Sequence, residues 1–364
     1  MFPRKCLWHL RRLQPADEAK VMNLFKTCLA GTEAKEKMEF DYWTWENKQN
    51  PDGYLILIAE HEEKLVGYYS MIYRRLKLGD KIVKAAFSID NMVHPQYRRQ
   101  GMFMAMVKQV NDLVGEEVVP ISLGFPNEQA RPGYRKVDWL EVFKIPTMVK
   151  IINSTPIVQA LLRNNPLSRV IGALMTKLLC MFFRGRRTHI PKDLSINTVS
   201  FFDSRFDKLW ASASKSLKIV GIRDSRRLNW RFIRVPHRKY IILTANVRDE
   251  LQAYVVLRTV NRRGIRAGLL IDMLAVPGAD EALLTLIKIS EVYFLSKKAA
   301  LIFCIMLPGW YSEILRRAGF IKLPKRLEPT EWIFIVRFNE PSIDKELIKN
   351  PHNWHITFED TDVL

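Results

Sequence analysis

Apolar and polar positions along the first half of the chain follow two periods, so both strands and helices are predicted. Alternation in twos indicates strands, and apolar spacings of three and four indicate helices. The expected strands are residues 7–13, 54–60, 65–74, 81–93 and 119–125. The expected helices are residues 16–29, 40–48 and 102–114, with a small helix before a closing hairpin near residues 139–148. The polar turn at residues 61–64 predicts an antiparallel hairpin between two of these strands.

The strand at 81–93 runs into a tight basic loop that opens the helix at 102–114. Such a loop can hold a pyrophosphate, because successive backbone N–H groups point at the anion and the helix N-terminus adds positive potential. Gly101 has no Cβ and lets the backbone approach a ligand closely. We therefore expect a nucleotide-like cofactor and a transferase. The residues expected to bind the cofactor here are Met92, Val93, Arg98, Arg99, Gln100, Gly101, Met102 and Phe103.

Residues 156–187 combine a wide apolar side with basic flanks. No acidic residue occurs from residue 151 to residue 192, whereas seven basic residues do. One interpretation is an amphipathic helix that lies on an anionic membrane surface. The other is a helical linker packed between two domains, which we favour because apolar stripes on helices usually face a core.

The second half of the chain repeats features of the first. The matching features are Trp45 with Trp230, Ile89-Asp90 with Ile271-Asp272 and Trp139 with Phe320. The separation within each pair is nearly constant and shrinks slowly along the chain. Such a drift indicates a duplicated domain with small deletions.

Composition narrows the class of protein. A length of 364 residues suggests two domains, and 48% hydrophobic residues exclude a disordered or fibrous chain. The four cysteines are far apart and form no Cys-x-x-Cys pair, so we expect free thiols in a reducing cytosol and no metal site. No secretory leader and no apolar run of ~20 residues is found. We therefore expect a cytoplasmic protein, or one that also contacts a membrane peripherally through residues 156–187.

The net charge of +19 is unevenly distributed. Residues 1–150 carry 23 Lys and Arg against 19 Asp and Glu, a net charge of +4, which leaves +15 to the rest. A strongly basic surface can attract phosphates, nucleic acid or an anionic membrane. Alternatively, it is a solvated face that only keeps the protein soluble. No motif indicates a sequence-specific nucleic-acid partner.

Two motifs in this order of elements resemble those of the GNAT acyltransferase superfamily. The first is the family's Arg/Gln-x-x-Gly-x-Gly/Ala loop, which here reads Arg98-Arg99-Gln100-Gly101-Met102-Phe103, with Phe103 in place of a small residue. The second follows the strand end Phe125-Pro126-Asn127. There Tyr134-Arg135-Lys136-Val137-Asp138-Trp139 resembles Tyr-x-Lys-x-Gly-Phe. The resemblance covers residues 7–148 well and residues 195–338 weakly.

The resemblance implies an α/β (α+β) fold of two tandem GNAT-like domains, each a mixed, mostly antiparallel sheet flanked by helices. The expected division is a CoA-binding domain at 1–150, a basic helical linker at 151–194, a degenerate GNAT-like domain at 195–340 and a tail at 341–364. The implied activity is acetyl-CoA-dependent N-acetyl transfer to a small-molecule amine. By analogy alone, the acceptor is an amino sugar of a surface glycan.

The resemblance also implies roles for individual residues. Asn127 matches a position that bonds the pantetheine arm of acetyl-CoA, and Tyr134 matches the tyrosine that protonates the departing thiolate. The backbone N–H of Val93 is expected to polarise the thioester carbonyl. Asp90 is either a catalytic base or amine-binding carboxylate, or a structural acid; we favour the structural role because Asp272 takes the same place in the second copy.

The second copy is not expected to bind CoA. Its loop at residues 276–282 contains no Arg-x-x-Gly, and Asp280 and Glu281 would repel a pyrophosphate. One active site per chain is therefore expected. The acidic end of the chain is interpreted either as a group of carboxylates that binds a cationic amine or as a disordered tail, although Trp354 and Phe358 favour some docking. The runner-up functions are a FemAB-like aminoacyl or peptidyl transferase, and a non-catalytic CoA-binding module.

Overall fold

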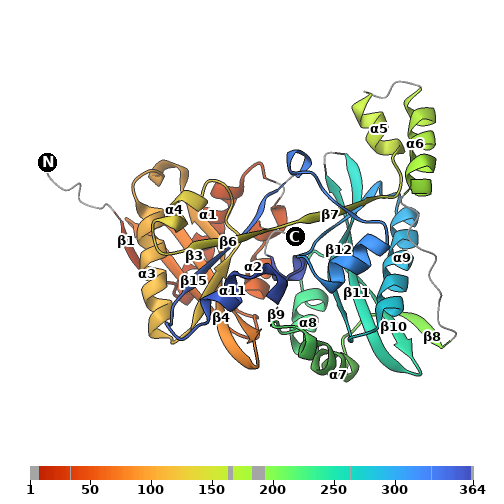
Figure 1. The fold of residues 1–364 in the computed structure, drawn as a ribbon. Coiled ribbons are helices and arrows are strands. Elements are labelled where there is room, and N and C mark those ends of the chain that lie inside the picture. Colours follow the sequence, from red (N-terminus) through yellow and green to blue (C-terminus); the bar gives the residue numbers. More distant parts are fainter. Residues whose placement is uncertain are drawn as a thin grey trace. The chain divides into compact units, whose positions relative to one another are not determined.

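The computed structural model of the protein describes residues 8–32, 34–162, 167–182, 193–262, 264–328 and 330–361 (Figure 1). The chain divides into two compact units. The first contains Met1–Lys144, Arg234–Arg238 and Ile333–Lys349. The second contains Ile145–Ile233, Lys239–Trp332 and Asn350–Leu364. Each unit therefore combines segments that are far apart in the sequence.

The first unit is a sheet with strand order β1-β2-β3-β4-β5-β15-β6. The strands are β1 (His9–Arg12), β2 (Tyr54–His61), β3 (Lys64–Leu78), β4 (Lys81–Val93), β5 (Ile121–Gly124), β15 (Trp332–Phe338) and β6 (Leu140–Ile145). Its helices are α1 (Glu18–Leu29), α2 (Phe40–Glu46), α3 (Met102–Glu116), α4 (Arg131–Arg135) and α11 (Lys345–Lys349). Strands β1 to β4 pair antiparallel, and β4 pairs with β5 in parallel. The strands predicted at 54–60, 65–74 and 81–93 and the helices predicted at 16–29 and 102–114 are confirmed.

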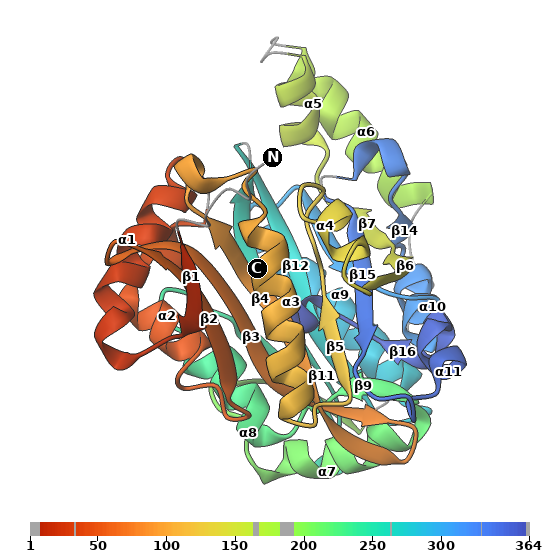
Figure 2. The same ribbon diagram turned by 90° about the vertical axis from the view of Figure 1, so that its left-hand side faces the viewer.

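Both faces of this sheet are covered, as the alternation along β2 requires. Leu55 and Leu57 pack with the apolar side of α3, on the face seen in Figure 2. Ile56 and Ile58 point to the other face and pack with α1. Gly67 on β3 lets α3 begin close to the sheet, since a Cβ there would lie 2.8 Å from the sulfur of Met102.

The second unit contains a sheet with strand order β14-β7-β13-β12-β11-β10-β8. The strands are β14 (Ile321–Lys322), β7 (Thr147–Ile151), β13 (Leu301–Ile305), β12 (Ile265–Ala275), β11 (Glu250–Arg262), β10 (Ile241–Val247) and β8 (Leu194–Val199). This unit also contains the short strands β9 (Ile219–Gly221) and β16 (Trp354–His355), which pair in parallel with each other and are not part of this seven-stranded order. The helices are α5 (Thr155–Leu161), α6 (Ser168–Phe182), α7 (Ser204–Ala213), α8 (Ser225–Leu228), α9 (Asp280–Ser296) and α10 (Trp310–Arg317).

The two sheets have the same arrangement of strands, and each includes one strand from the other half of the chain. In each sheet a four-stranded antiparallel run is followed by a parallel strand, β5 or β13. The next strand comes from the other half of the chain: β15 pairs antiparallel with β5, and β7 pairs antiparallel with β13. The predicted fold class, mixed sheets flanked by helices, is confirmed.

The closing hairpin predicted near residues 139–148 is wrong. Strands β6 and β7 are separated by Pro146 alone and belong to different sheets. A single residue is too short a connection to reverse the chain, and a proline keeps the residue before it extended. The chain therefore continues from one sheet into the other.

None of the helices in the described ranges has both the length and the hydropathy that a bilayer span requires. The helical stretch predicted at 156–187 consists of two helices, α5 and α6. Residues 163–166 and 183–187 of that prediction lie outside the described residues.

Candidate active site

The basic loop leads from the end of β4 to the start of α3 and is shaped for an anion. After a 3-10 turn at Pro95–Tyr97, Arg99 and Gly101 adopt left-handed backbone conformations, with φ of 61° and 80°. No hydrogen bond of the described residues occupies the backbone N–H groups of residues 99–104. A Cβ built on Gly101 would meet no atom within 4 Å, so the space in front of this glycine is open. Unpaired N–H groups around an open space at a helix N-terminus form an anion-binding concavity.

The side chains of the loop divide into those available to a ligand and those that hold the loop. Met92 and Met102 are buried in the cores of the first unit, so only their backbones can reach a ligand. Arg98 and Arg99 lie at the surface, and Arg98 Nε donates to the carbonyl of Val93 at 3.1 Å. The side-chain amide of Gln100 donates to the carbonyl of Gln96. The predicted cofactor residues are thus brought together, and both arginines can reach a ligand from the surface.

His94 is buried at the first turn of the loop. Its Nδ1 accepts from the backbone N–H of Gln96 and caps the 3-10 turn. Burial, followed by repulsion from Lys64 and Arg98, lowers the pKa of His94. The imidazole is therefore neutral at pH 7, as an acceptor at this cap must be.

The ring of Phe103 packs against α4 instead of filling the loop. It lies edge-on to Tyr134, with 5.4 Å between ring centroids. It also covers Gly133, where a Cβ would lie only 2.5 Å from Phe103 Cε1. The large residue in the last motif position is thus accommodated by a glycine on another helix, and the loop stays open.

Tyr134 is buried, and its hydroxyl forms hydrogen bonds with polar side chains of β3 and β4. It lies 2.8 Å from Ser88 Oγ and 3.1 Å from the hydroxyl of Tyr69, and it accepts from the amide of Asn91. Burial raises the pKa of Tyr69 to about 12, so that hydroxyl stays protonated. The network holds the Tyr134 oxygen beside Ser88.

Ser88 marks the point where β4 and β5 part. Their pairing runs from Ala85 with Ile121 to Ser88 with Gly124 and stops there. Beyond it a bulge disturbs the pairing of β4 with β3 at Asp90 and Asn91. The N–H of His94 donates to β3 at 2.8 Å, so the alternation of backbone groups turns the Val93 N–H away from β3. The Val93 N–H and the loop lie at the carboxyl end of β4, and the Tyr134 hydroxyl bonds Ser88 and Asn91 of the same strand.

Asp90 sits on the bulge with a φ of 45° and a buried carboxylate. Lys37 Nζ donates to its Oδ1 at 2.6 Å and lies 3.8 Å from Glu46. Its Oδ2 accepts no hydrogen bond from the described residues. Asp90 is therefore held by a cation and keeps one acceptor oxygen unused.

Asn127 lies at the exposed entrance to α4. Its Oδ1 accepts from the backbone N–H of Ala130 at 2.9 Å, so its amide nitrogen remains a donor for a ligand. Arg131 and Arg135 anchor the short α4 by donating to Glu141 on β6. These hydrogen bonds lower the pKa of Glu141 to about 2. The sequence analysis missed this anchor, although two arginines closely followed by a glutamate suggest one.

Residues 9–142 match the model of a family described as an acetyltransferase (GNAT) domain. This segment is a GNAT domain. Two solved structures similar to the whole chain are a GCN5-related N-acetyltransferase from Anabaena variabilis and a Saccharomyces cerevisiae N-myristoyltransferase with bound myristoyl-CoA. The first has a TM-score of 0.65 at 12% identity, over 92% of this chain and 73% of that one. The second has a TM-score of 0.61 at 12% identity, over 98% and 90%.

At this identity the likeness to solved structures concerns the fold. A third example, from Enterococcus faecalis and titled a probable N-acyltransferase, has a TM-score of 0.63 at 11% identity and covers 91% of this chain and 72% of that one. A sequence search of curated proteins finds no match. The likeness in fold thus extends beyond the segment matched in sequence.

The loop of the second unit differs from the loop of the GNAT segment. Asp280 and Glu281 open α9, and Arg317 binds both carboxylates at 2.8 and 2.6 Å. Trp310 Nε1 also donates to Asp280 at 2.9 Å. Carboxylates thus occupy the helix N-terminus that a phosphate would need.

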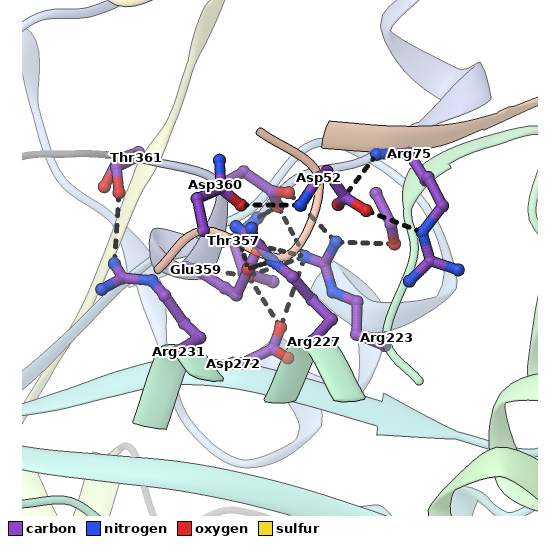
Figure 3. Close-up of polar contacts among 12 residues, drawn as sticks. Asp52, Arg75, Arg223, Arg227, Arg231, Asp272, Thr357, Glu359, Asp360 and Thr361 are labelled. Atoms are coloured by element: carbon purple, nitrogen blue, oxygen red, sulfur yellow. Dashed lines mark hydrogen bonds and ion pairs between the residues drawn. The ribbon is translucent and has the colours of Figure 1, made fainter. Parts of the chain in front are cut away.

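A buried charge cluster in the second unit centres on Arg223 (Figure 3). Its guanidinium lies 2.6 Å from Asp360, 3.5 Å from Asp272 and 3.6 Å from Glu359. Burial acts to lower the pKa of Arg223, but attraction to Asp360, Asp272 and Glu359 outweighs burial and raises it. Arg227 binds Glu359 at 3.0 Å. The cluster joins β12 to the C-terminal segment.

Both interpretations of the acidic chain end are therefore wrong for the residues that the structure describes. Glu359 and Asp360 bind arginines of their own unit and offer no site for an amine. Trp354 and Phe358 are buried, so this segment is docked. Asp362 lies outside the described residues.

Proposed function

We propose that the protein is an acetyl-CoA-dependent N-acetyltransferase that acts on a small amine. The observation that carries this proposal is the set of N–H groups at residues 99–104 to which no described residue bonds, together with a Tyr134 hydroxyl at Ser88, where β4 and β5 part. The family of the segment and the myristoyl-CoA bound in a neighbour of the same fold support a CoA thioester. An amino sugar of a surface glycan is the acceptor that we propose to test first.

The residues present fit the parts of CoA in order. The loop N–H groups would hold the pyrophosphate, with Arg98 and Arg99 near the phosphates. The amide nitrogen of Asn127 would donate to the pantetheine arm. The Val93 N–H would donate to the thioester oxygen, where negative charge develops during attack. Since the second unit has acids at the equivalent helix start, one cofactor per chain is proposed.

In the reaction the amine nitrogen forms a bond to the thioester carbon, and the carbon–sulfur bond breaks. The sulfur keeps the electron pair, and the Tyr134 hydroxyl gives it a proton. The amine loses a proton, and the unused Oδ2 of Asp90 is the acceptor that we propose for it. The same carboxylate, to which Lys37 donates at 2.6 Å, is also the group that we propose could bind the amine in its ammonium form.

Titration calorimetry of the full chain with CoA and acetyl-CoA tests the cofactor assignment. We expect one site per chain, with a dissociation constant in the range of ordinary substrate KM values, about 1 μM to 1 mM. No heat at millimolar cofactor would remove the acetyltransferase proposal. Two sites would contradict the exclusion of the second unit. Binding without turnover of amines would favour a non-catalytic CoA module.

Tyr134→Phe tests the acid. We expect kcat to fall by about 100-fold or more, because the thiolate then leaves without a proton donor. The KM for acetyl-CoA should change little. The fold should persist, since Ser88 still bonds Tyr69 and Asn91. Tyr54→Phe, at an exposed tyrosine, is the control and should behave as wild type. A Tyr134→Phe variant with unchanged kcat would remove this role.

A further inference from the structure

We propose that the helical pair α5–α6 docks the protein on an anionic membrane surface. The two helices lie side by side in Figures 1 and 2 and follow directly from β7. This proposal is independent of the acyl-transfer chemistry.

The two helices meet through small and hydroxyl-bearing residues. Gly172 lies against α5, where a Cβ would come within 2.6 Å of Thr155 Cα. Ser154 Oγ bonds the Gly172 carbonyl and the Thr176 hydroxyl, both at 2.7 Å. Ser168, one turn before Gly172, is also buried. The side of α6 that faces α5 thus carries small and hydroxyl-bearing residues. Residues of this kind are typical of closely packed helices in membranes.

The outer side of α6 is apolar and exposed. Its large apolar residues, each 42–67% exposed, are Leu167, Val170, Ile171, Leu174, Met175 and Leu178. A helix of a water-soluble core normally turns this side inward. The described part of α6 therefore presents a contiguous apolar face to an external partner.

The positive charge of this segment favours an anionic bilayer as that partner. Residues 151–192 contain no Asp or Glu. Their basic residues are Arg163, Arg169, Lys177, Arg184, Arg186, Arg187 and Lys192. Basic residues near an anionic leaflet contribute about 1 kcal/mol each, and an amphipathic helix on such a surface buries its apolar face at the acyl boundary. With 15 residues, α6 is only about 22 Å long at about 1.5 Å per residue, so it lies in the plane of the interface.

Flotation of the full chain with vesicles tests this proposal. We expect binding to vesicles that mix phosphatidylcholine with phosphatidylglycerol, little binding to pure phosphatidylcholine, and release at about 1 M salt, which screens the attraction. The variant Leu174→Glu/Leu178→Glu should weaken binding at least tenfold while leaving the melting temperature unchanged, because both side chains are exposed. The matched control is Val292→Glu/Leu295→Glu on α9, which replaces two other exposed apolar residues and should bind as wild type.

Three outcomes would overturn the proposal. The first is no flotation with anionic vesicles. The second is equal flotation of the Leu174→Glu/Leu178→Glu variant and wild type. The third is a dimer in sedimentation equilibrium that this variant abolishes, without any vesicle binding, which would assign the face to a second copy of the chain.

Discussion

Gly101→Val is expected to weaken binding of CoA and acetyl-CoA by about 100-fold or more. Gly101 has a φ of 80°, which a β-branched residue adopts only with strain. The new side chain would also enter the open space in front of the N–H groups of residues 99–104. Losing one or two hydrogen bonds to a charged group, at about 1.5–3 kcal/mol each, gives an effect of this size. Titration calorimetry measures it.

Gly79→Val is the matched control for this prediction. Gly79 also has a positive φ, 60°, and a Cβ there would also meet no atom within 4 Å. It lies in the turn between β3 and β4, away from the loop. Both variants should therefore lose similar stability, about 1–2 kcal/mol, but only Gly101→Val should lose the cofactor. Equal affinities of Gly101→Val and wild type would show that the loop does not hold CoA.

The parts of this site that the sequence predicted are those encoded within a few neighbouring residues. The loop and its helix can be read between residues 89 and 114, because the strand, the glycine and the apolar spacing follow one another. The orientation of Phe103 could not be predicted from these residues, because the space for its ring is provided by Gly133 on another helix. The bulge at Asp90 is likewise visible only in the pairing with β3.

The strand exchange and the buried charges depend on partners that are far apart in the chain. The residues of β15 have the apolar pattern of any buried strand, and nothing local indicates that they pair with β5, which belongs to the first half of the chain. Arg223 and Asp360 are likewise distant in sequence but lie within 2.6 Å of each other. The acidic end was visible in the sequence, but its pairing with Arg223 becomes evident only once the C-terminal segment is docked.

Arg223→Met is expected to release the C-terminal segment from the second unit. The arginine is the cation shared by Asp272, Glu359 and Asp360, and its side chain is fully buried. Removing one partner of a buried ion pair costs about 3–5 kcal/mol, because the remaining charges are left uncompensated. Methionine fills much of the volume, so the loss reflects charge more than a cavity. With two units a single free energy of unfolding is not well defined, so a local measurement is preferable.

Amide hydrogen exchange of residues 350–361 supplies that measurement. We expect exchange there to become about 100- to 5,000-fold faster, as a local loss of about 3–5 kcal/mol implies, while β2 and β3 of the first unit keep their protection. Arg205→Met, which breaks the exposed pair with Asp203, is the control and should change exchange by less than tenfold. Adding Asp360→Asn to Arg223→Met should restore part of the protection, since one uncompensated carboxylate is then removed. Unchanged exchange in Arg223→Met would mean that apolar burial of Trp354 and Phe358 alone holds the segment in place.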